Sequence, residues 1–252
     1  MKSGDQSAPF NVLDWLDGAL FLDFDGTLVE LAPTPEQVIV APGLVDALRV
    51  IHDRLDGRLA IVSGRPIAQI DAMLATLTLP VAGVHGMERR DAAGALHYAP
   101  VPSFSAVASR ALHLASMHPR LRVEQKRGAL ALHYRQAPEL EPLCLSEMRL
   151  AVKECPGMLL LHGKMVLEVK PASASKGTAI RDFLAETPFL GRRPVFAGDD
   201  TTDELGFAWV QQAGGLAFKI GPGPSLARER IASPQVLGMA LLDAARVLSK
   251  GS

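Results

Sequence analysis

An apolar run, Ala19–Leu22, ends abruptly in the acidic segment Asp23–Thr27, which reads Asp-Phe-Asp-Gly-Thr. Such a run predicts a buried strand that leads into a functional turn. In an extended backbone, residues i and i+2 point to the same side about 7 Å apart, so Asp23 and Asp25 can address one ligand. Gly26 allows the backbone to turn sharply. A calcium loop of the EF-hand type is the alternative, but it needs glycine at its sixth position, and Gly26 stands fourth.

Composition limits the class of protein. Of the 252 residues, 48% are apolar and 21% are charged, as is typical of a soluble globular protein with ample core. The formal net charge is −1 and only 5% of residues are aromatic, so neither nucleic acid nor an anionic membrane is an expected partner. Cys144 and Cys155 are too few for a disulfide framework or a zinc site. No apolar stretch approaches the roughly 20 residues that span a bilayer. Met1–Asn11 lacks the order of a secretory signal, so we expect a cytoplasmic protein.

Two stretches of the chain, before Pro100 and after Ser175, alternate short apolar runs with helical spacing of apolar residues. Helix starts are indicated by Pro42 and Pro66. Helices are expected to alternate with strands at 19–23, 59–62, 80–84, 194–197 and 216–220. This alternation is typical of a parallel sheet that is buried on both faces. The sequence therefore predicts an α/β fold with a Rossmann-like, doubly wound parallel-sheet core.

The segment between these stretches has a different pattern. Two helical patterns alternate with two strand pairs, which reverse at Arg127-Gly128 and near Gly163-Lys164. This αββαββ order suits a small antiparallel sheet backed by two helices, and linkers rich in proline and serine flank it. We expect an α+β cap domain, residues 102–172, inserted into a core domain of residues 1–101 and 173–252.

Polar residues follow four of the expected core strands and begin one expected helix. In an open parallel sheet, ligands bind beyond the carboxyl ends of the strands. Each residue alone has an ordinary structural explanation: Ser63 can cap a helix, Lys176 can lie on the surface, and the late aspartates can begin a helix. Their joint position at one sheet edge favours a shared site composed of Asp23, Asp25, Ser63, Gly64, Arg65, His85, Lys176, Asp199 and Asp200.

Phosphoryl transfer is the chemistry that uses such a set. A carboxylate that attacks a phosphate ester meets electrostatic repulsion, which a bridging Mg²⁺ removes. Ser63 and the amides near Gly64 can donate hydrogen bonds to phosphoryl oxygens. Lys176 supplies a fixed positive charge for these oxygens and for the attacking Asp23. Asp25 can then protonate the leaving alkoxide and later deprotonate the attacking water.

These motifs resemble the four motifs of the haloacid-dehalogenase-like phosphatase superfamily, and all four occur in the expected order. The motifs are Asp23–Thr27, Ser63, Lys176 and Gly198–Asp203. The resemblance implies that Asp23 is phosphorylated and that Asp25 is the acid and base. It also implies a magnesium site formed by Asp23, the backbone carbonyl of Asp25, and Asp199, with Asp203 in support.

A narrower resemblance is to the trehalose-6-phosphate phosphatases. It runs from about Phe21 to about Glu204 and covers both the expected core and the expected cap. The segments that carry it are 63–66, 83–89, 123–126, 133–135, 167–171 and 198–204.

The expected cap contributes its own candidate residues. Glu124 and Lys126 are two apart on an expected strand, so they share one face. Carboxylates beside an ammonium suit a sugar, whose hydroxyls both donate and accept hydrogen bonds; a solvated charged face of an amphipathic sheet is the alternative. The resemblance implies that Glu124, Lys126 and Glu168 grip the glucose ring remote from the phosphate. Arg65 and His85 are further candidates for substrate binding; the alternatives are that Arg65 braces Glu88 and that His85 is a packed turn residue.

The resemblance implies a magnesium-dependent hydrolase that converts trehalose 6-phosphate to trehalose and phosphate in trehalose biosynthesis. We expect it to act on this small molecule as a monomer. The alternatives are a phosphatase for another sugar phosphate, of the sucrose or mannosylglycerate phosphate type, or a related phosphomutase. A non-catalytic sugar-phosphate sensor would be expected to lose Asp23 or Lys176, and both are present.

Overall fold

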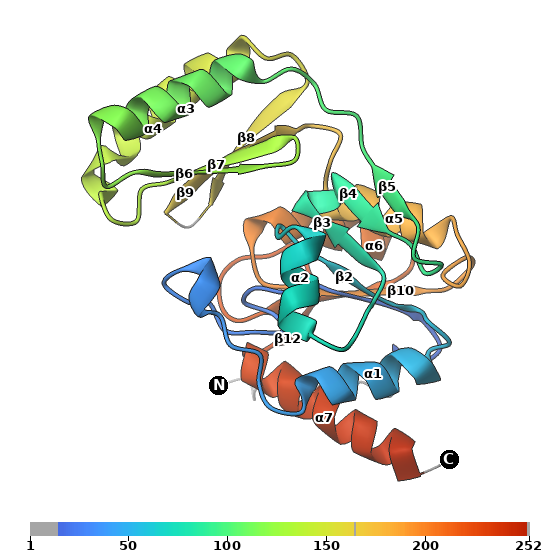
Figure 1. The fold of residues 1–252 in the computed structure, drawn as a ribbon. Helices are drawn as coiled ribbons and strands as arrows, with labels where there is room; N and C mark the ends of the chain where they lie inside the picture. Colours follow the sequence, from blue (N-terminus) through green and yellow to red (C-terminus); the bar gives the residue numbers. More distant parts are fainter. Residues whose placement is uncertain (1–14, 164, 251–252) are drawn as a thin grey trace, which may run out of the picture.

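The computed structural model describes residues 15–163 and 165–250. The expectation about a secretory signal at Met1–Asn11 and the expected turn residue Lys164 lie outside these ranges. Figure 1 shows a larger core unit around one sheet and a smaller unit in which two helices cover a second sheet. Among the described residues, no helix is long and apolar enough to cross a membrane.

Within the described ranges, eight strands form the core sheet. All pair in parallel except β4 and β5, which pair antiparallel at one edge. The strands β1, β2, β3 and β10 are buried along their whole length, because helices cover both faces. In spatial order the strands are β12 (Glu229–Ile231), β11 (Leu216–Ile220), β10 (Pro194–Gly198), β1 (Ala19–Leu22), β2 (Leu59–Val62), β3 (Val81–Gly83), β4 (Glu88–Arg90) and β5 (Leu96–Tyr98).

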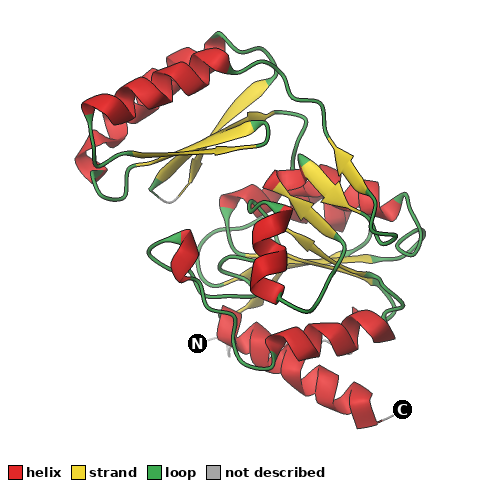
Figure 2. Ribbon diagram, viewed as in Figure 1, coloured by secondary structure: helices red, strands yellow, loops and turns green. Residues whose placement is uncertain are grey.

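Helices pack on both faces of the core sheet (Figure 2). Alternate residues of each strand point to opposite faces. Leu20 and Leu22 of β1 join one apolar cluster, whereas Phe21 joins the other. The first cluster includes α1 (Leu44–Arg54), α2 (Ile67–Leu74) and α7 (Pro234–Lys250). The second includes α5 (Lys176–Leu184) and α6 (Glu204–Gln212). The predicted doubly wound α/β core is therefore confirmed.

The smaller unit is an antiparallel sheet backed by two helices, in the expected αββαββ order. Leu130 and Leu132 of β7 pack with Leu167 and Val169 of β9 against the helices. The alternate residues of these strands lie on the opposite face of the sheet. The domain boundaries given above stay predictions. The elements are α3 (Ser105–Met117), α4 (Glu141–Lys153) and, in spatial order, β6 (Arg122–Lys126), β7 (Ala129–His133), β9 (Val166–Pro171) and β8 (Met158–Gly163).

Candidate active site

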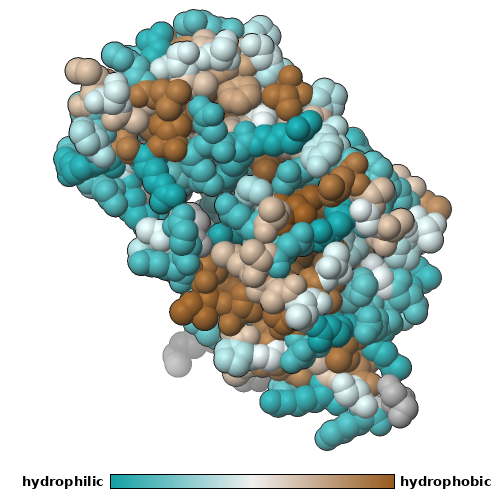
Figure 3. All heavy atoms as spheres, viewed as in Figure 1, coloured by the Kyte–Doolittle hydropathy of each residue, from teal (hydrophilic) through white to brown (hydrophobic). Residues whose placement is uncertain are grey.

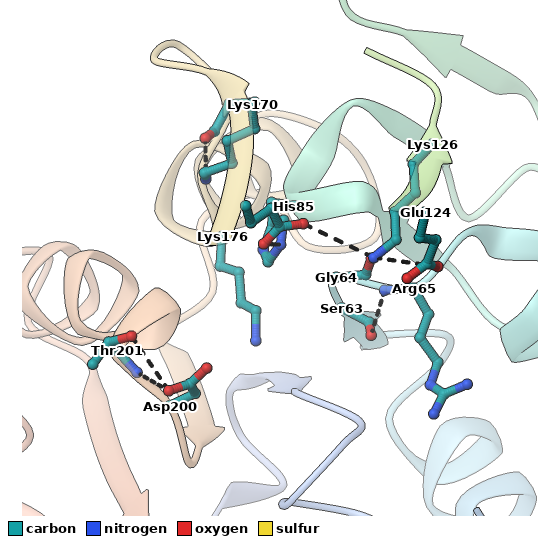
Figure 4. A network of polar contacts seen from close by, with 12 residues as sticks. Ser63, Gly64, Arg65, His85, Glu124, Lys126, Lys170, Lys176, Asp200 and Thr201 are labelled. Atoms are coloured by element: carbon teal, nitrogen blue, oxygen red, sulfur yellow. Dashed lines mark hydrogen bonds and ion pairs between the residues drawn. The ribbon is translucent and has the colours of Figure 1, made fainter. Parts of the chain in front are cut away.

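The predicted core residues meet at one edge of the sheet, where β1, β2, β3 and β10 end. Figure 4 shows Ser63, His85 and Lys176 among them. Asp23 follows β1 directly, and Ser63 follows β2. His85 lies in a 3-10 turn that follows β3, and Asp199 follows β10. Lys176 is the first residue of α5. The edge of a parallel sheet thus gathers residues that are far apart in the sequence.

Asp23 is buried and held by two donors. The Lys176 Nζ lies 2.6 Å from Asp23 Oδ1, and the Thr27 hydroxyl donates to Asp23 Oδ2 at 3.1 Å. The same Nζ lies 2.6 Å from Asp203 Oδ1. Ser175 caps α5 through a capping box, which fixes the helix start and therefore the base of the Lys176 side chain. One ammonium thus bridges two buried carboxylates.

Burial and mutual repulsion shift the pKa values of the acidic residues. Burial is the main cause that raises the pKa of Asp23, and Lys176 opposes it while Asp203 and Asp199 add to it. Burial, followed by the charge of Asp203, raises the pKa of Asp199 to about 7. Although burial disfavours its charged form, the carboxylates of Asp203 and Asp23 raise the pKa of Lys176. The site therefore holds more negative charge than its lysine balances.

These carboxylates fit a hard divalent cation. Ligand oxygens of Asp23, Asp199 and Asp203 lie within 4.8 Å of one another. A Cβ at Gly26, where φ is 74°, would lie 2.1 Å from Asp199 Oδ2, so only glycine lets Asp199 approach the first acidic turn. Oxygen donors that repel one another when ionised are the set that such a cation stabilises.

Asp203 does more than the predicted support. Its Oδ2 accepts hydrogen bonds from the backbone N–H groups of Asp199 and Asp200, at 3.0 Å and 2.9 Å, and its Oδ1 contacts Lys176. The carboxylate of Asp200 instead accepts from the N–H of Thr201 at 2.7 Å and caps a 3-10 turn. Asp203 therefore braces the loop after β10 and also belongs to the acidic cluster.

Asp25 lies apart from this cluster of carboxylates. Its two oxygens accept from Nε and an Nη of Arg65, at 2.6 Å and 2.7 Å. Arg65, a predicted substrate-binding residue, is therefore paired with Asp25, the predicted acid and base. Ser63 is fully buried, and its Oγ accepts from the N–H of Arg65 at 3.1 Å. The predicted role of the Asp25 carbonyl at a metal stays a prediction.

The cap residues lie on the sheet face that meets the core. Ala131 of β7 pairs with Glu124 of β6 on one side and with Glu168 of β9 on the other. Directly paired residues of neighbouring strands point to the same face of the sheet, so Glu124 and Glu168 share a face. Lys126 Nζ lies 3.8 Å from Glu124 Oε1 and 3.9 Å from Glu168 Oε1. The same Nζ donates to the carbonyl of Gly64 at 3.0 Å (Figure 4). Largely hydrophilic residues lie where the two units approach each other (Figure 3).

Hydrogen bonds from two histidines help to lower the pKa values of Glu124 and Glu168. A hydrogen bond from His133, at 3.0 Å, is the main cause that lowers the pKa of Glu124. Burial acts to raise the pKa of Glu168, but its interaction with His85, followed by the charges of Lys126 and Lys170, lowers it to about 2. Both carboxylates are therefore ionised acceptors at neutral pH.

Sequence patterns gave no role to three residues near the site. Lys170 is buried and donates from Nζ to the carbonyl of Ala174, in the loop before α5. Lys219 is buried and donates to the carbonyls of Asp199 and Ile220. His133 orients Glu124, as described above. The signal for Lys219 was present, because a lysine inside an apolar strand is uncommon without a partner.

The pKa of Lys170 leads to a test of its burial. Burial lowers this pKa from 10.5 to about 8, and Lys176 contributes in the same direction. Between these values the unfolded chain binds more protons than the native protein, so the contribution of Lys170 to stability rises with pH. We expect the free energy of unfolding of the wild type, relative to Lys170→Met, to rise by up to about 3 kcal/mol from pH 8 to pH 10.5. Urea denaturation across this range measures the difference, and a flat profile would contradict the shift.

The fold and the site together define a haloacid-dehalogenase-like phosphatase, in which a doubly wound sheet presents an acidic pair after its first strand and a lysine from a later helix. Within this class, the chain belongs to the trehalose-phosphatase family, whose model matches residues 21–234. The predicted family and enzyme class, a phosphoric monoester hydrolase, are confirmed by this match.

Individual relatives agree with this assignment. The chain is 44% identical over 216 residues to a trehalose-6-phosphate phosphatase of Escherichia coli, covering 85% of this chain and 81% of that protein. It is 42% identical over 218 residues to a probable trehalose-phosphate phosphatase of Sinorhizobium fredii, covering 85% and 82%. Among solved structures, a trehalose-6-phosphate phosphatase related protein matches with a TM-score of 0.73 and 26% identity, covering 92% of this chain and 99% of that one. The C-terminal domain of the Candida albicans enzyme has a TM-score of 0.81 at 20% identity, over 95% and 99%, and supports the fold.

Proposed function

We propose that this protein hydrolyses trehalose 6-phosphate to trehalose and inorganic phosphate, with Mg²⁺ as its metal ion. One observation carries the proposal: the buried pair of Asp23 and Lys176, within an acidic cluster, lies under a sheet face that carries Glu124, Lys126 and Glu168. The first group suits a phosphoryl centre and the second a polyhydroxylated leaving group. Cytoplasmic location and a monomeric state stay predictions from the sequence.

The proposed reaction has two displacement steps. Asp23 Oδ forms a bond to phosphorus while the bond from phosphorus to the sugar oxygen breaks, and Asp25 gives its proton to the leaving alkoxide. Water then attacks the aspartyl phosphate, Asp25 takes a proton from that water, and phosphate leaves with Asp23 restored. Lys176 orients Asp23 and balances charge in both steps. A bound Mg²⁺, held by Asp23, Asp199 and the Asp25 carbonyl, would offset the repulsion between carboxylate and phosphate.

Asp25 needs freedom of movement for these steps. Both of its oxygens are bonded to Arg65, and its side chain is 31% exposed. A carboxylate that bonds to a guanidinium through both oxygens has no oxygen left to protonate an alkoxide. We therefore propose that substrate binding frees at least one Asp25 oxygen from Arg65.

The test is phosphate release from a panel of sugar phosphates and from p-nitrophenyl phosphate. We expect wild-type protein to prefer trehalose 6-phosphate and to yield trehalose as co-product. Glu124→Ala, Lys126→Ala and Glu168→Ala should each lower kcat/KM for trehalose 6-phosphate by about 10²-fold. The reason is that contacts with the sugar, remote from the phosphate, supply binding energy that stabilises the transition state. The same variants should lower kcat/KM for p-nitrophenyl phosphate by less than about fivefold.

Glu139→Ala is a matched control, since Glu139 is a cap carboxylate that pairs with Arg120 on the exposed surface. It should keep the wild-type preference. Equal losses of kcat/KM on both substrates in the three cap variants would contradict the proposal that this sheet face binds the sugar. Preference for another disaccharide phosphate would redirect the substrate assignment, and phosphoryl transfer between positions of one sugar would indicate a mutase.

A further inference from the structure

The turn after β3 has an unusual backbone. Val84, His85 and Gly86 have φ values of 47°, 55° and 97°, so three successive residues lie in the left-handed region. Two of them carry a Cβ, and a β-branched residue such as Val84 is rarely found there. Such strain persists only where the surrounding structure enforces it, and it concentrates at functional sites. The turn therefore holds His85 in a position that an ordinary backbone would not reach.

The loop after β2 is shaped around the same imidazole. A Cβ at Gly64 would lie 2.9 Å from both Cε1 and Nε2 of His85, so a side chain there would collide with the ring. The N–H of His85 donates to the carbonyl of Ser63 at 2.9 Å. The ring is buried, with 4% of the residue exposed. Two core loops thus fix the position of this side chain.

The fixed ring meets the cap at Glu168, where Nε2 lies 2.9 Å from Oε2. Burial lowers the pKa of His85, so the ring is neutral at pH 7, whereas Glu168 is ionised and can only accept. Nε2 therefore carries the ring proton and donates a hydrogen bond to Oε2. The other oxygen, Oε1, is buried and has no hydrogen-bond partner among the described residues, with Lys126 Nζ 3.9 Å away.

We infer that His85 is a positioning residue for sugar recognition: it holds one oxygen of Glu168 so that the other oxygen accepts a hydrogen bond from a substrate hydroxyl. This inference rests on the proposed function, in which Glu168 binds the sugar. It changes the role expected from the sequence, where His85 itself contacts substrate. It also makes recognition depend on cap and core together, because the donor lies on one unit and the acceptor on the other.

Two substitutions at His85 distinguish the positioning of Glu168 by the imidazole from a requirement for a residue that tolerates the left-handed backbone. His85→Asn keeps a residue that tolerates the left-handed region but has no donor at the position of Nε2. His85→Gln places an amide N–H near that position and is the conservative rescue. We expect His85→Asn to lower kcat/KM for trehalose 6-phosphate by about 10- to 100-fold, the effect of losing a hydrogen bond to a charged group. Its loss on p-nitrophenyl phosphate should be at least about tenfold smaller, and His85→Gln should recover most of the sugar-phosphate activity.

A double-variant cycle decides between positioning and direct contact. In a Glu168→Ala background, His85→Asn should have no further effect on kcat/KM for trehalose 6-phosphate, because its target is already gone. Independent losses that multiply would overturn the inference and favour direct contact of His85 with the substrate. Equal losses of His85→Asn on both substrates would also overturn it.

A measurement without substrate tests the hydrogen bond between His85 and Glu168 independently of the proposed function. Imidazole ¹⁵N–¹H correlation spectra of the wild-type protein should show His85 as the neutral tautomer with the proton on Nε2. Glu168→Ala should change that signal, whereas Glu139→Ala should not. A His85 signal that is insensitive to Glu168→Ala would overturn the inference even if trehalose 6-phosphate proved to be the substrate. A wild type without sugar preference would instead refute the proposed function, while this spectrum still decides whether the pair exists.

Discussion

Replacing Asp23 by Asn is expected to lower kcat for phosphate release by at least about 10⁴-fold. An amide is a far weaker nucleophile than a carboxylate, and Asp25 lies outside the cluster of Asp23, Asp199 and Asp203, so it is not placed to replace Asp23 as the nucleophile. The fold should persist, because Asn has nearly the same shape and burial already disfavours the charged form of Asp23. Thermal unfolding and phosphate release measure the two properties on one sample.

A trapping experiment connects the loss to the mechanism. Acid-quenched wild-type enzyme should carry phosphate on Asp23 during turnover, as detected by mass spectrometry of the peptide, and Asp23→Asn should carry none. Asp182→Asn is a suitable control, since Asp182 is half exposed and pairs with its neighbour Arg181. Phosphate release by Asp23→Asn at the wild-type rate would contradict covalent catalysis by this residue.

The sequence predicts which core residues meet at one sheet edge, because one rule of topology places them. Asp23 and Lys176 are 153 residues apart, yet their side chains touch. Strand ends of a parallel sheet share an edge, so locating the strands locates the residues that follow them. The strands were easy to locate, since β1, β2 and β10 are fully apolar runs buried on both faces.

Partners of those residues were harder to predict. The sequence leaves two partners open for Arg65, a phosphate and Glu88, but the structure pairs it with Asp25. Only the local path of the loop decides which anion it contacts. Asp203 could be placed in the right loop, whereas its contact with Lys176 depends on how a 3-10 turn directs its side chain. Spacing fixes which face or edge a residue occupies, and it does not fix which of several nearby partners it bonds.

The elements that escaped prediction lie at the margins of the core. The strands β4 and β5 form a short edge hairpin, and Glu88 to Arg90 carries three charged residues, so no apolar alternation marks it. The helix α7 was not predicted either, although Leu237, Leu241 and Leu248 lie on one buried face at a helical period. An edge strand can lack a clear alternation of apolar residues because one side of it needs no burial, whereas a helix that covers the sheet has a regular apolar face.

Lys176→Met is expected to reduce both activity and stability. The ammonium contacts two buried carboxylates at 2.6 Å, and methionine would fill its volume without its charge. Loss of one partner from a buried ion pair leaves uncompensated charge, so the free energy of unfolding at pH 7 should fall by about 3–5 kcal/mol. The value of kcat should fall by at least about 10³-fold, because a preorganised donor to the reacting groups is gone. Urea denaturation and phosphate release measure the two effects.

A second substitution separates the two effects. In the double variant Lys176→Met with Asp203→Asn, one of the two orphaned carboxylates becomes a neutral amide that still accepts from the backbone of the loop after β10. Part of the lost stability should therefore return, while kcat should stay low because the charge near Asp23 is still missing. Wild-type stability of Lys176→Met at pH 7 would show that a bound cation or protonated carboxylates already balance the cluster. Recovery of kcat in the double variant would show that Lys176 serves the structure of the site and not its chemistry.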